Sequence, residues 1–232
     1  MPALILGVTG AIATGKSLVC QTLVDLGAVH CDADKLVHRL YDPGTPGFER
    51  VVAAFGPDIV GTDGYIDRTI LGTKVFGRPE EMRRLTSAIG NIGDAIKAVI
   101  DEWRATLADE ATAVMESVNH TESGYGAWCD QTWLVACDED IARARLITRN
   151  NYTLEEANQR LASQRPWHTR APAADFVIGN NGEMQEVVSA VQRECRRLSN
   201  LKQRGALPES RYHPWWAERQ AAFAGQRRQR ES

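Results

Sequence analysis

The sequence predicts an α/β fold in which a parallel β-sheet is covered by helices on both faces. Short apolar runs alternate with helical patterns along the chain, the order expected of β-α-β units. Hydrophobic residues make up 43% and charged residues 25% of the 232 residues, as in an ordinary globular protein. The length fits one domain with an insertion or a tail better than two domains.

The composition also excludes several functional classes. No apolar run reaches the roughly 18 residues that a transmembrane helix needs, and Met1 is followed by no charged flank or cleavage site of a secretion signal. The five cysteines are scattered without a C-x-x-C pair, as is usual in a reducing compartment. The net charge of −3 gives no general attraction to nucleic acid or lipid. We therefore expect a cytoplasmic protein without a membrane or nucleic-acid partner.

Five apolar segments are predicted as strands. Residues 3–8 form a continuous apolar run, typical of a strand buried on both faces. The segment 16–26 then carries Val19, Leu23 and Leu26 at helical spacing, and Gly27 ends it. The remaining predicted strands are 29–31, 113–115, 132–136 and 176–178, and the remaining helices are 32–41, most of 46–110, 138–149, one from Thr153 and a long one ending near 201.

Residues 10–17, G-A-I-A-T-G-K-S, match the G-x-x-x-x-G-K-[ST] pattern of a phosphate-binding loop, placed between a strand and a helix. Backbone N–H groups and a helix N-terminus bind phosphate oxygens in such a loop. We predict that Lys16 contacts the β- and γ-phosphates and that the Ser17 hydroxyl ligates Mg²⁺. The predicted ATP-binding residues of the loop are Gly10, Ala11, Ile12, Ala13, Thr14, Gly15, Lys16, Ser17 and Leu18.

The loop alone does not name a reaction, because GTPases, motors and small-molecule kinases share it. The chain lacks the N-K-x-D signature of guanine recognition, which argues against a GTPase. An arginine-rich helix later in the chain favours a kinase, in which cationic side chains stabilise the transferring phosphoryl group.

Further motifs follow the loop in a specific order: L-G-A at 26–28, C-D-A-D at 31–34, D-G-Y-I-D-R at 63–68, Gln164, and D-F-V-I-G-N-N-G at 175–182. With these motifs the chain resembles the dephospho-CoA kinase family over about residues 4–195. The resemblance implies ATP-dependent phosphorylation of the ribose 3′-hydroxyl of dephospho-CoA, with Mg²⁺ as cofactor. We expect a monomer or a small homo-oligomer.

The resemblance also implies how the chain is divided into a kinase domain and its parts. It implies a P-loop kinase fold with a five-stranded parallel core, within a kinase domain of residues 1–201. A helical acceptor-binding insertion is expected at about 60–110 and a lid at about 138–165. Residues 202–232 then form a basic C-terminal extension.

Asp34 is the predicted catalytic base. It follows the second strand, at the carboxyl edge of the sheet, where ligands of open α/β sheets bind. A carboxylate there can accept the proton of the acceptor hydroxyl and orient it, the role that the resemblance implies. The alternative is that Asp32 or Asp34 caps the following helix.

Three arginines are further candidates. Arg145 and Arg149, at i and i+4, share a helix face with Arg143 nearby. The resemblance places Arg145 and Arg149 in the lid. It implies that Arg145 is a catalytic residue that contacts the phosphates and that Arg149 lies near the ATP. The alternative is that these arginines form a solvated basic face of the helix. Arg68 is predicted to contact the acceptor, or else to form a surface salt bridge.

Two more residues complete the predicted site. Asn181, in an Asn-Asn-Gly turn, is expected beside the adenine of ATP, although a plain turn would have the same sequence. Glu122 is expected to contact the acceptor or Mg²⁺, with a surface glutamate as the alternative.

The chain departs from the family pattern at three places. Gly90-Asn91 stands where the family usually has a His-Pro pair. Residues 118–121 differ at every position from the family's P-L-L-[FY] stretch, and only the following Glu122 is shared. Ala142 stands where the family usually has a glutamine. The first two departures fall in regions expected to shape the acceptor pocket. Two rival functions therefore stay open: a kinase of another hydroxyl, such as that of a nucleoside or nucleotide, and a non-catalytic nucleotide-binding module.

The C-terminal extension is basic and aromatic. Residues 196–232 hold nine Lys and Arg against three Asp and Glu, together with Trp215, Trp216 and Phe223. We predict a short helix after the tryptophan pair. The segment is expected to pack its aromatic side chains on the body of the protein or on a neighbouring subunit and to leave its charges solvated. The alternative is contact with nucleic acid.

Overall fold

A computed structural model describes residues 2–231 of the chain, with side chains up to residue 224. The chain divides into two compact units. We call Met1–Cys31 together with Ile100–Ser232 the core unit, and Asp32–Val99 the helical unit.

The core unit is built on the predicted five-stranded sheet. Its strands are β1 (Leu4–Gly10), β2 (Val29–Asp32), β3 (Thr112–Glu116), β4 (Gln131–Ala136) and β5 (Phe176–Gly179), in the spatial order β2-β3-β1-β4-β5. β1 pairs in parallel with both β3 and β4, and β4 pairs in parallel with β5. Every residue of β1 is buried, as its apolar run predicts. The loop after β1 therefore opens at the carboxyl edge of a parallel sheet, where such folds bind ligands.

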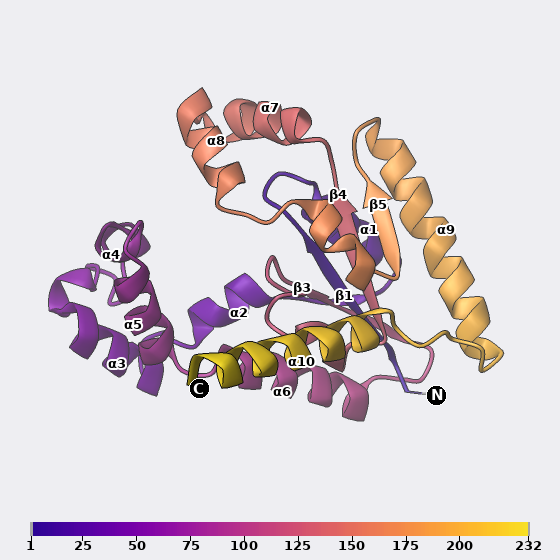
Figure 1. The fold of residues 1–232 in the computed structure, drawn as a ribbon, viewed down its shortest axis with the longest axis horizontal. Helices are drawn as coiled ribbons and strands as arrows, with labels where there is room; N and C mark the ends of the chain where they lie inside the picture. Colours follow the sequence, from indigo (N-terminus) through magenta and orange to yellow (C-terminus); the bar gives the residue numbers. More distant parts are fainter. Residues whose placement is uncertain (1, 232) are drawn as a thin grey trace. The chain divides into compact units, whose positions relative to one another are not determined.

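Helices cover both faces of this sheet, which confirms the predicted fold class. On one face, α1 (Lys16–Asp25) and α9 (Met184–Gln203) bury Leu23 and Val191 against β1 and its neighbours. On the opposite face, Gly7 of β1 lies so close to the His120 ring that a Cβ would overlap it. In Figure 1, α10 (Tyr212–Glu231, yellow) crosses in front of β1 and β3, whereas α1 lies behind the strands.

Two helices of the core unit occupy the expected lid region. They are α7 (Glu139–Asn150) and α8 (Leu154–Ala162), which pack on each other. A capping box begins the second of these helices: Thr153 accepts from the Glu156 N–H, and the Glu156 carboxylate accepts from the Thr153 N–H. Three short 3₁₀ turns complete the unit at Tyr125–Trp128 (η2), Trp167–Thr169 (η3) and Ala171–Ala173 (η4).

The helical unit has its own hydrophobic core, formed by buried side chains such as Val51, Ile59 and Leu71. Its elements are α2 (Ala33–Arg39), α3 (Pro46–Phe55), η1 (Pro57–Ile59), α4 (Arg68–Val75), α5 (Pro79–Ile89) and the first part of α6 (Ile92–Thr106).

The Gly90-Asn91 departure has a local structural role in this unit. Gly90 ends α5 with φ at 107°, a conformation that favours glycine. The Asn91 side-chain oxygen then accepts a hydrogen bond from the Asp94 N–H at 3.3 Å, in the first turn of α6. The pair thus stops one helix and starts the next.

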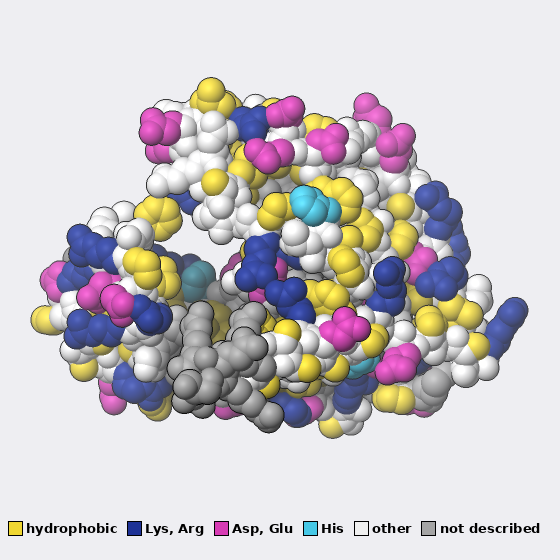
Figure 2. All heavy atoms as spheres, in the orientation of Figure 1, with side chains coloured by type: hydrophobic (Ala, Val, Ile, Leu, Met, Phe, Trp, Pro, Cys, Tyr) yellow, Lys and Arg dark blue, Asp and Glu magenta, His cyan; other side chains and the backbone are white. Residues whose placement is uncertain are grey.

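The C-terminal helix differs from the prediction. It is 20 residues long and begins at Tyr212, before the tryptophan pair, so the prediction of a short helix after that pair was wrong. Pro214 lies in its first turn, where proline is tolerated because no intrahelical N–H bond is lost. Lys and Arg side chains are exposed along the outer side of α9 (Figure 2). Among the described helices, none combines the length and the apolar composition needed to cross a bilayer.

Candidate functional site

The phosphate loop adopts a conformation that requires glycine at both predicted positions. A Cβ on Gly10 would lie 2.5 Å from the Val135 carbonyl oxygen. Gly15 has φ at 95°, and a Cβ there would overlap the Asn180 side-chain nitrogen. Ala13 also takes a left-handed conformation, with φ at 61°. The loop is therefore tightly curved and closely packed between β4 and the chain after β5.

The two polar side chains that end the motif lie at the start of α1. The Lys16 ammonium donates to the carbonyl oxygens of Gly10 at 3.0 Å and Ala11 at 3.2 Å, so its charge lies over the loop. Ser17 is exposed in the first turn of α1. A hydroxyl oxygen beside a phosphate site is the kind of hard ligand that Mg²⁺ prefers, so Ser17 fits the predicted metal role.

Three side chains from distant parts of the sequence fix the loop. Arg145 of α7 donates to the Ala13 carbonyl oxygen at 3.3 Å and to the Asn180 main-chain and side-chain oxygens at 3.0 and 3.2 Å. Asn180 donates to the Thr14 carbonyl oxygen at 2.8 Å, and Gln164 accepts from the Ile12 N–H at 2.7 Å. We call Arg145, Asn180 and Gln164 the loop clamp.

Sequence analysis gave Gln164 no role and expected the Asn180-Asn181-Gly182 turn as a whole beside the adenine. Gln164 and Asn180 both lie in motifs that matched the family, which was the available signal. The Asn181 side chain accepts from the Asp138 N–H at 2.8 Å, at the start of α7. Asn180 is 5% exposed and faces the loop, so the two neighbouring asparagines hold different segments.

The other arginines of α7 have separate environments. Arg143 forms ion pairs with Glu139 and Asp140 and donates to the Asn158 side chain, so its charge is neutralised within α7 and α8. Arg149 is exposed and lines a cavity of about 440 Å³ together with Leu18, Arg145, Asn180 and Met184. This cavity adjoins the loop on the side of α1 and is the candidate place for the rest of the nucleotide.

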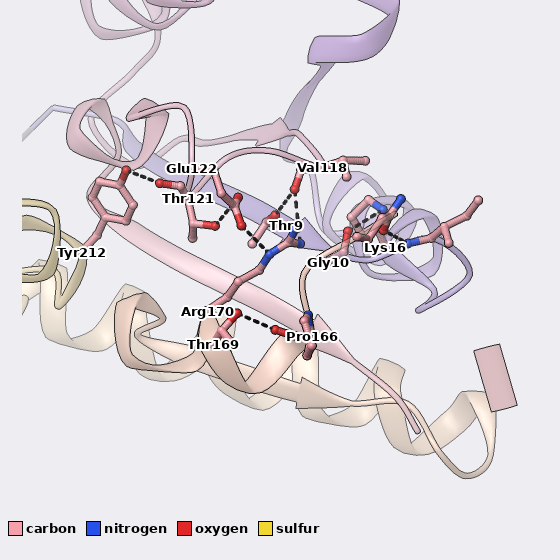
Figure 3. A network of polar contacts seen from close by, with 12 residues as sticks. Thr9, Gly10, Lys16, Val118, Thr121, Glu122, Pro166, Thr169, Arg170 and Tyr212 are labelled. Atoms are coloured by element: carbon pink, nitrogen blue, oxygen red, sulfur yellow. Dashed lines mark hydrogen bonds and ion pairs between the residues drawn. The ribbon is translucent and has the colours of Figure 1, made fainter. Parts of the chain in front are cut away.

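Glu122 belongs to a buried polar network on the other side of the loop (Figure 3). The Arg170 guanidinium, 3% exposed, donates to the Glu122 carboxylate at 2.7 Å and to the Val118 carbonyl oxygen at 3.4 Å. The Thr9 hydroxyl of β1 donates to the same carbonyl oxygen at 3.0 Å. Glu122 is thus a partly buried, ion-paired residue whose side chain is 21% exposed. Sequence reasoning missed its partner, Arg170.

A second cavity, of about 510 Å³, opens at this network. Its lining includes Glu122, Arg170, Gln164 and Arg165. Gln164 also belongs to the loop clamp, so this polar cavity adjoins the phosphate loop. Its charged and polar walls suit a polar, anionic ligand.

Two predicted residues, Asp34 and Arg68, belong to the helical unit. The Asp32 carboxylate accepts from the N–H groups of Asp34 at 2.9 Å and Lys35 at 3.2 Å, so Asp32 is the helix cap. Asp34 is exposed in the first turn of α2, and Arg68 is exposed at the start of α4. Burial lowers the pKa of His38; the Arg68 charge lowers it further, and the Asp34 charge opposes this. Asp34 and Arg68 therefore lie near the same imidazole.

A separate set of possible metal ligands lies on the α1 side of the sheet. The ligand atoms of Cys20, His30 and Glu116 lie within 4.8 Å of one another. A thiolate and an imidazole favour Zn²⁺ over Mg²⁺. Since His30 and Glu116 already approach to 3.2 Å, these groups do not need a metal to be paired.

Comparisons with known proteins identify what this chain is similar to. A family model described as dephospho-CoA kinase matches residues 4–186. The dephospho-CoA kinase of Geobacillus kaustophilus is 38% identical over 204 residues, which cover 88% of this chain and 98% of that protein. The dephospho-CoA kinase of Streptococcus pyogenes is 38% identical over 198 residues, covering 85% of this chain and 99% of that protein.

Solved structures share the fold of this chain. The crystal structure of TT1252 from Thermus thermophilus has a TM-score of 0.69 and 25% identity, covering 85% of this chain and 99% of that one. A dephospho-CoA kinase from Campylobacter jejuni has a TM-score of 0.57 and 21% identity, covering 83% and 96%, which supports the fold alone.

Proposed function

This chain belongs to the dephospho-CoA kinase family, and we propose that it transfers the γ-phosphoryl group of ATP to the ribose 3′-hydroxyl of dephospho-CoA. The observation that carries the proposal is the glycine-dependent loop, with the Lys16 charge over it and Arg145 fixing it from α7. A cytoplasmic location, with ATP as co-substrate, is part of the same proposal.

The loop side of the site binds the triphosphate. The loop N–H groups and Lys16 bind the β- and γ-phosphates, and Arg145 stabilises the charge of the transferring group. In this proposal Arg149 and Asn181 also lie near the nucleotide. The loop clamp fixes the phosphate loop before the reaction. Such preorganised charge is the main source of rate enhancement in phosphoryl transfer. Ser17 would hold Mg²⁺, which neutralises phosphate charge and orients the transferring group.

The acceptor side supplies the nucleophile. Asp34 accepts the proton of the 3′-hydroxyl while the oxygen of that hydroxyl bonds to the γ-phosphorus. The bond between that phosphorus and the β,γ-bridging oxygen breaks, and ADP leaves. Arg68 and Glu122 contact the acceptor. In this proposal Glu122 is positioned by Arg170 at the wall of the polar cavity.

An acceptor panel tests the proposal. Purified protein is mixed with ATP, Mg²⁺ and dephospho-CoA, adenosine or AMP, and coenzyme A and ADP are measured by mass. We expect coenzyme A only with the first acceptor, and a loss of at least about a hundredfold in Lys16→Met. Asp34→Asn is expected to lose turnover while it still binds ATP.

The same panel separates the rival functions. Phosphorylation of adenosine or AMP without coenzyme A would indicate a kinase of another hydroxyl. Tight ATP binding without ADP from any acceptor would indicate a nucleotide-binding module that does not catalyse transfer.

A further inference from the structure

The C-terminal extension contains a buried tyrosine that bonds to the main chain beside the candidate acceptor site. The family match ends at residue 186, before α10 begins. The side chain of Tyr212, the first residue of α10, is completely buried in the core unit. Its hydroxyl donates to the Thr121 carbonyl oxygen at 2.8 Å.

Two glycines shape the surface that receives this helix. A Cβ on Gly126 would lie 2.5 Å from the Tyr212 ring, and a Cβ on Gly124 would lie 3.0 Å from the Trp216 ring. The His120 ring, which is also fully buried, lies 6.2 Å from the Tyr212 ring between centroids. The segment 118–128 and the start of α10 are therefore complementary in shape.

The start of α10 is also fixed to the sheet. The Ser210 hydroxyl and the Arg211 N–H each donate to the Asp175 carboxylate at 2.7 Å. The same carboxylate accepts from the Thr132 N–H of β4 at 2.6 Å. Tyr212 is thus held in place by the strands and is not a flexible attachment.

From Tyr212 the contacts lead directly to Glu122. Tyr212 bonds to the main chain of Thr121, and the Thr121 hydroxyl donates to one Glu122 oxygen at 2.7 Å. Arg170 donates to the other oxygen (Figure 3). Residues 118–121 are also where the chain departs from its family pattern, and Thr121 is fully buried beneath Tyr212.

We propose that Tyr212 is a positioning residue for the acceptor: its hydroxyl fixes the Thr121 main chain and, through it, the Glu122 carboxylate at the polar cavity. This inference rests on the proposed function, in which Glu122 contacts dephospho-CoA. In this proposal the C-terminal extension helps to position a residue that binds the acceptor.

The test compares Tyr212→Phe, which keeps the ring and removes only the hydroxyl, with the unmodified chain. KM for dephospho-CoA is expected to rise roughly three- to tenfold, the effect of one lost hydrogen bond. KM for ATP is expected to stay within about twofold, because the loop clamp does not include α10. Phe223→Ala, an exposed position of the same helix, is the matched control and should change neither KM.

A double-mutant cycle shows whether the effect passes through Glu122. In a Glu122→Gln background, Tyr212→Phe is expected to have little further effect on KM for dephospho-CoA. The inference would be overturned if the effects of Tyr212→Phe and Glu122→Gln on KM for dephospho-CoA were fully additive. It would also be overturned if Tyr212→Phe left that KM unchanged or raised the KM values of both substrates equally. The proposed function would stand in each case. If the unmodified chain makes no coenzyme A, the proposed function fails, and this inference fails with it.

Discussion

At the residue scale, two arginines of α7 illustrate how environment decides function. Arg143 is paired with carboxylates of its own helix, whereas Arg145 donates to the phosphate loop and to Asn180. Arg145→Ala is expected to lower kcat by about a hundredfold or more, because in the proposed function Arg145 stabilises the charge of the transferring group. Arg143→Ala, its matched control, should stay within about twofold. Steady-state kinetics with both substrates measures this, and equal losses in the two variants would contradict the assignment.

His120 gives a prediction about stability. Its ring is fully buried, neither ring nitrogen has a partner among the described residues, and burial lowers its pKa from 6.5 to about 4. Between these values the unfolded chain binds a proton that the folded chain does not, so stability is highest above pH 6.5 and falls as the pH drops toward 4. The loss amounts to about 3 kcal/mol in total.

Urea unfolding at pH 7.5 and pH 5 measures this dependence. His120→Gln cannot titrate, so its free energy of unfolding should vary less over that range than the free energy of the unmodified chain. A parallel pH dependence in the two proteins would show that another group is responsible.

Neighbouring residues mark the limit of what the sequence predicts at this scale. The motif located the Asn-Asn-Gly turn but could not show that Asn180 faces the loop while Asn181 holds the start of α7. In the same way, C-D-A-D predicted a cap and a catalytic acid, and only the hydrogen bonds identify Asp32 as the cap. Adjacent side chains point in different directions that depend on backbone dihedral angles, which residue spacing does not fix.

At the scale of elements, the phosphate loop depends on Gly15 for two reasons that can be separated. Its φ of 95° disfavours any side chain, and a Cβ would also overlap Asn180. Gly27 has nearly the same φ, 93°, but nothing lies within 4 Å of its Cβ position. Gly15→Ala is therefore expected to weaken ATP binding by at least about tenfold, because it displaces the loop clamp, whereas Gly27→Ala costs only about 1 kcal/mol of stability.

Calorimetric titration with ATP and thermal unfolding of both variants test this prediction. If Gly27→Ala weakened ATP binding as much as Gly15→Ala, backbone strain alone would account for the loss.

The strands were predictable for a physical reason that did not extend to the C-terminal helix. Strands buried on both faces require continuous apolar runs, and residues 3–8 and 132–136 show them. The start of α10 carries Pro214 and a mixed pattern of polar and aromatic residues, so its boundary depends on tertiary contacts. Tyr212 packs against Gly126, 86 positions earlier, which no local pattern reveals.

At the scale of the whole molecule, charge and composition describe the C-terminal segment but do not show how it is attached to the core unit. The excess of basic residues marks residues 196–232 as a distinct segment by charge. In the structure, α9 contributes Val191 and Leu198 to the core of the sheet, and α10 buries Tyr212 on the opposite face. Net charge reports on solubility and partners, whereas a few buried aromatic contacts decide whether a segment belongs to the folded unit.

Removing the extension should therefore destabilise the protein. A chain ending at Gly205 loses Tyr212, the bonds to Asp175 and the Pro208 carbonyl oxygen that accepts from Gln131. Loss of a buried aromatic side chain alone costs about 3–5 kcal/mol, so Tm is expected to fall by on the order of 10 °C. Thermal unfolding followed by circular dichroism measures the shift, with Phe223→Ala as the control that keeps these contacts. ATP affinity should change less than acceptor affinity, because the loop clamp lies outside the removed segment; an unchanged Tm would show that α10 contributes little to the core unit.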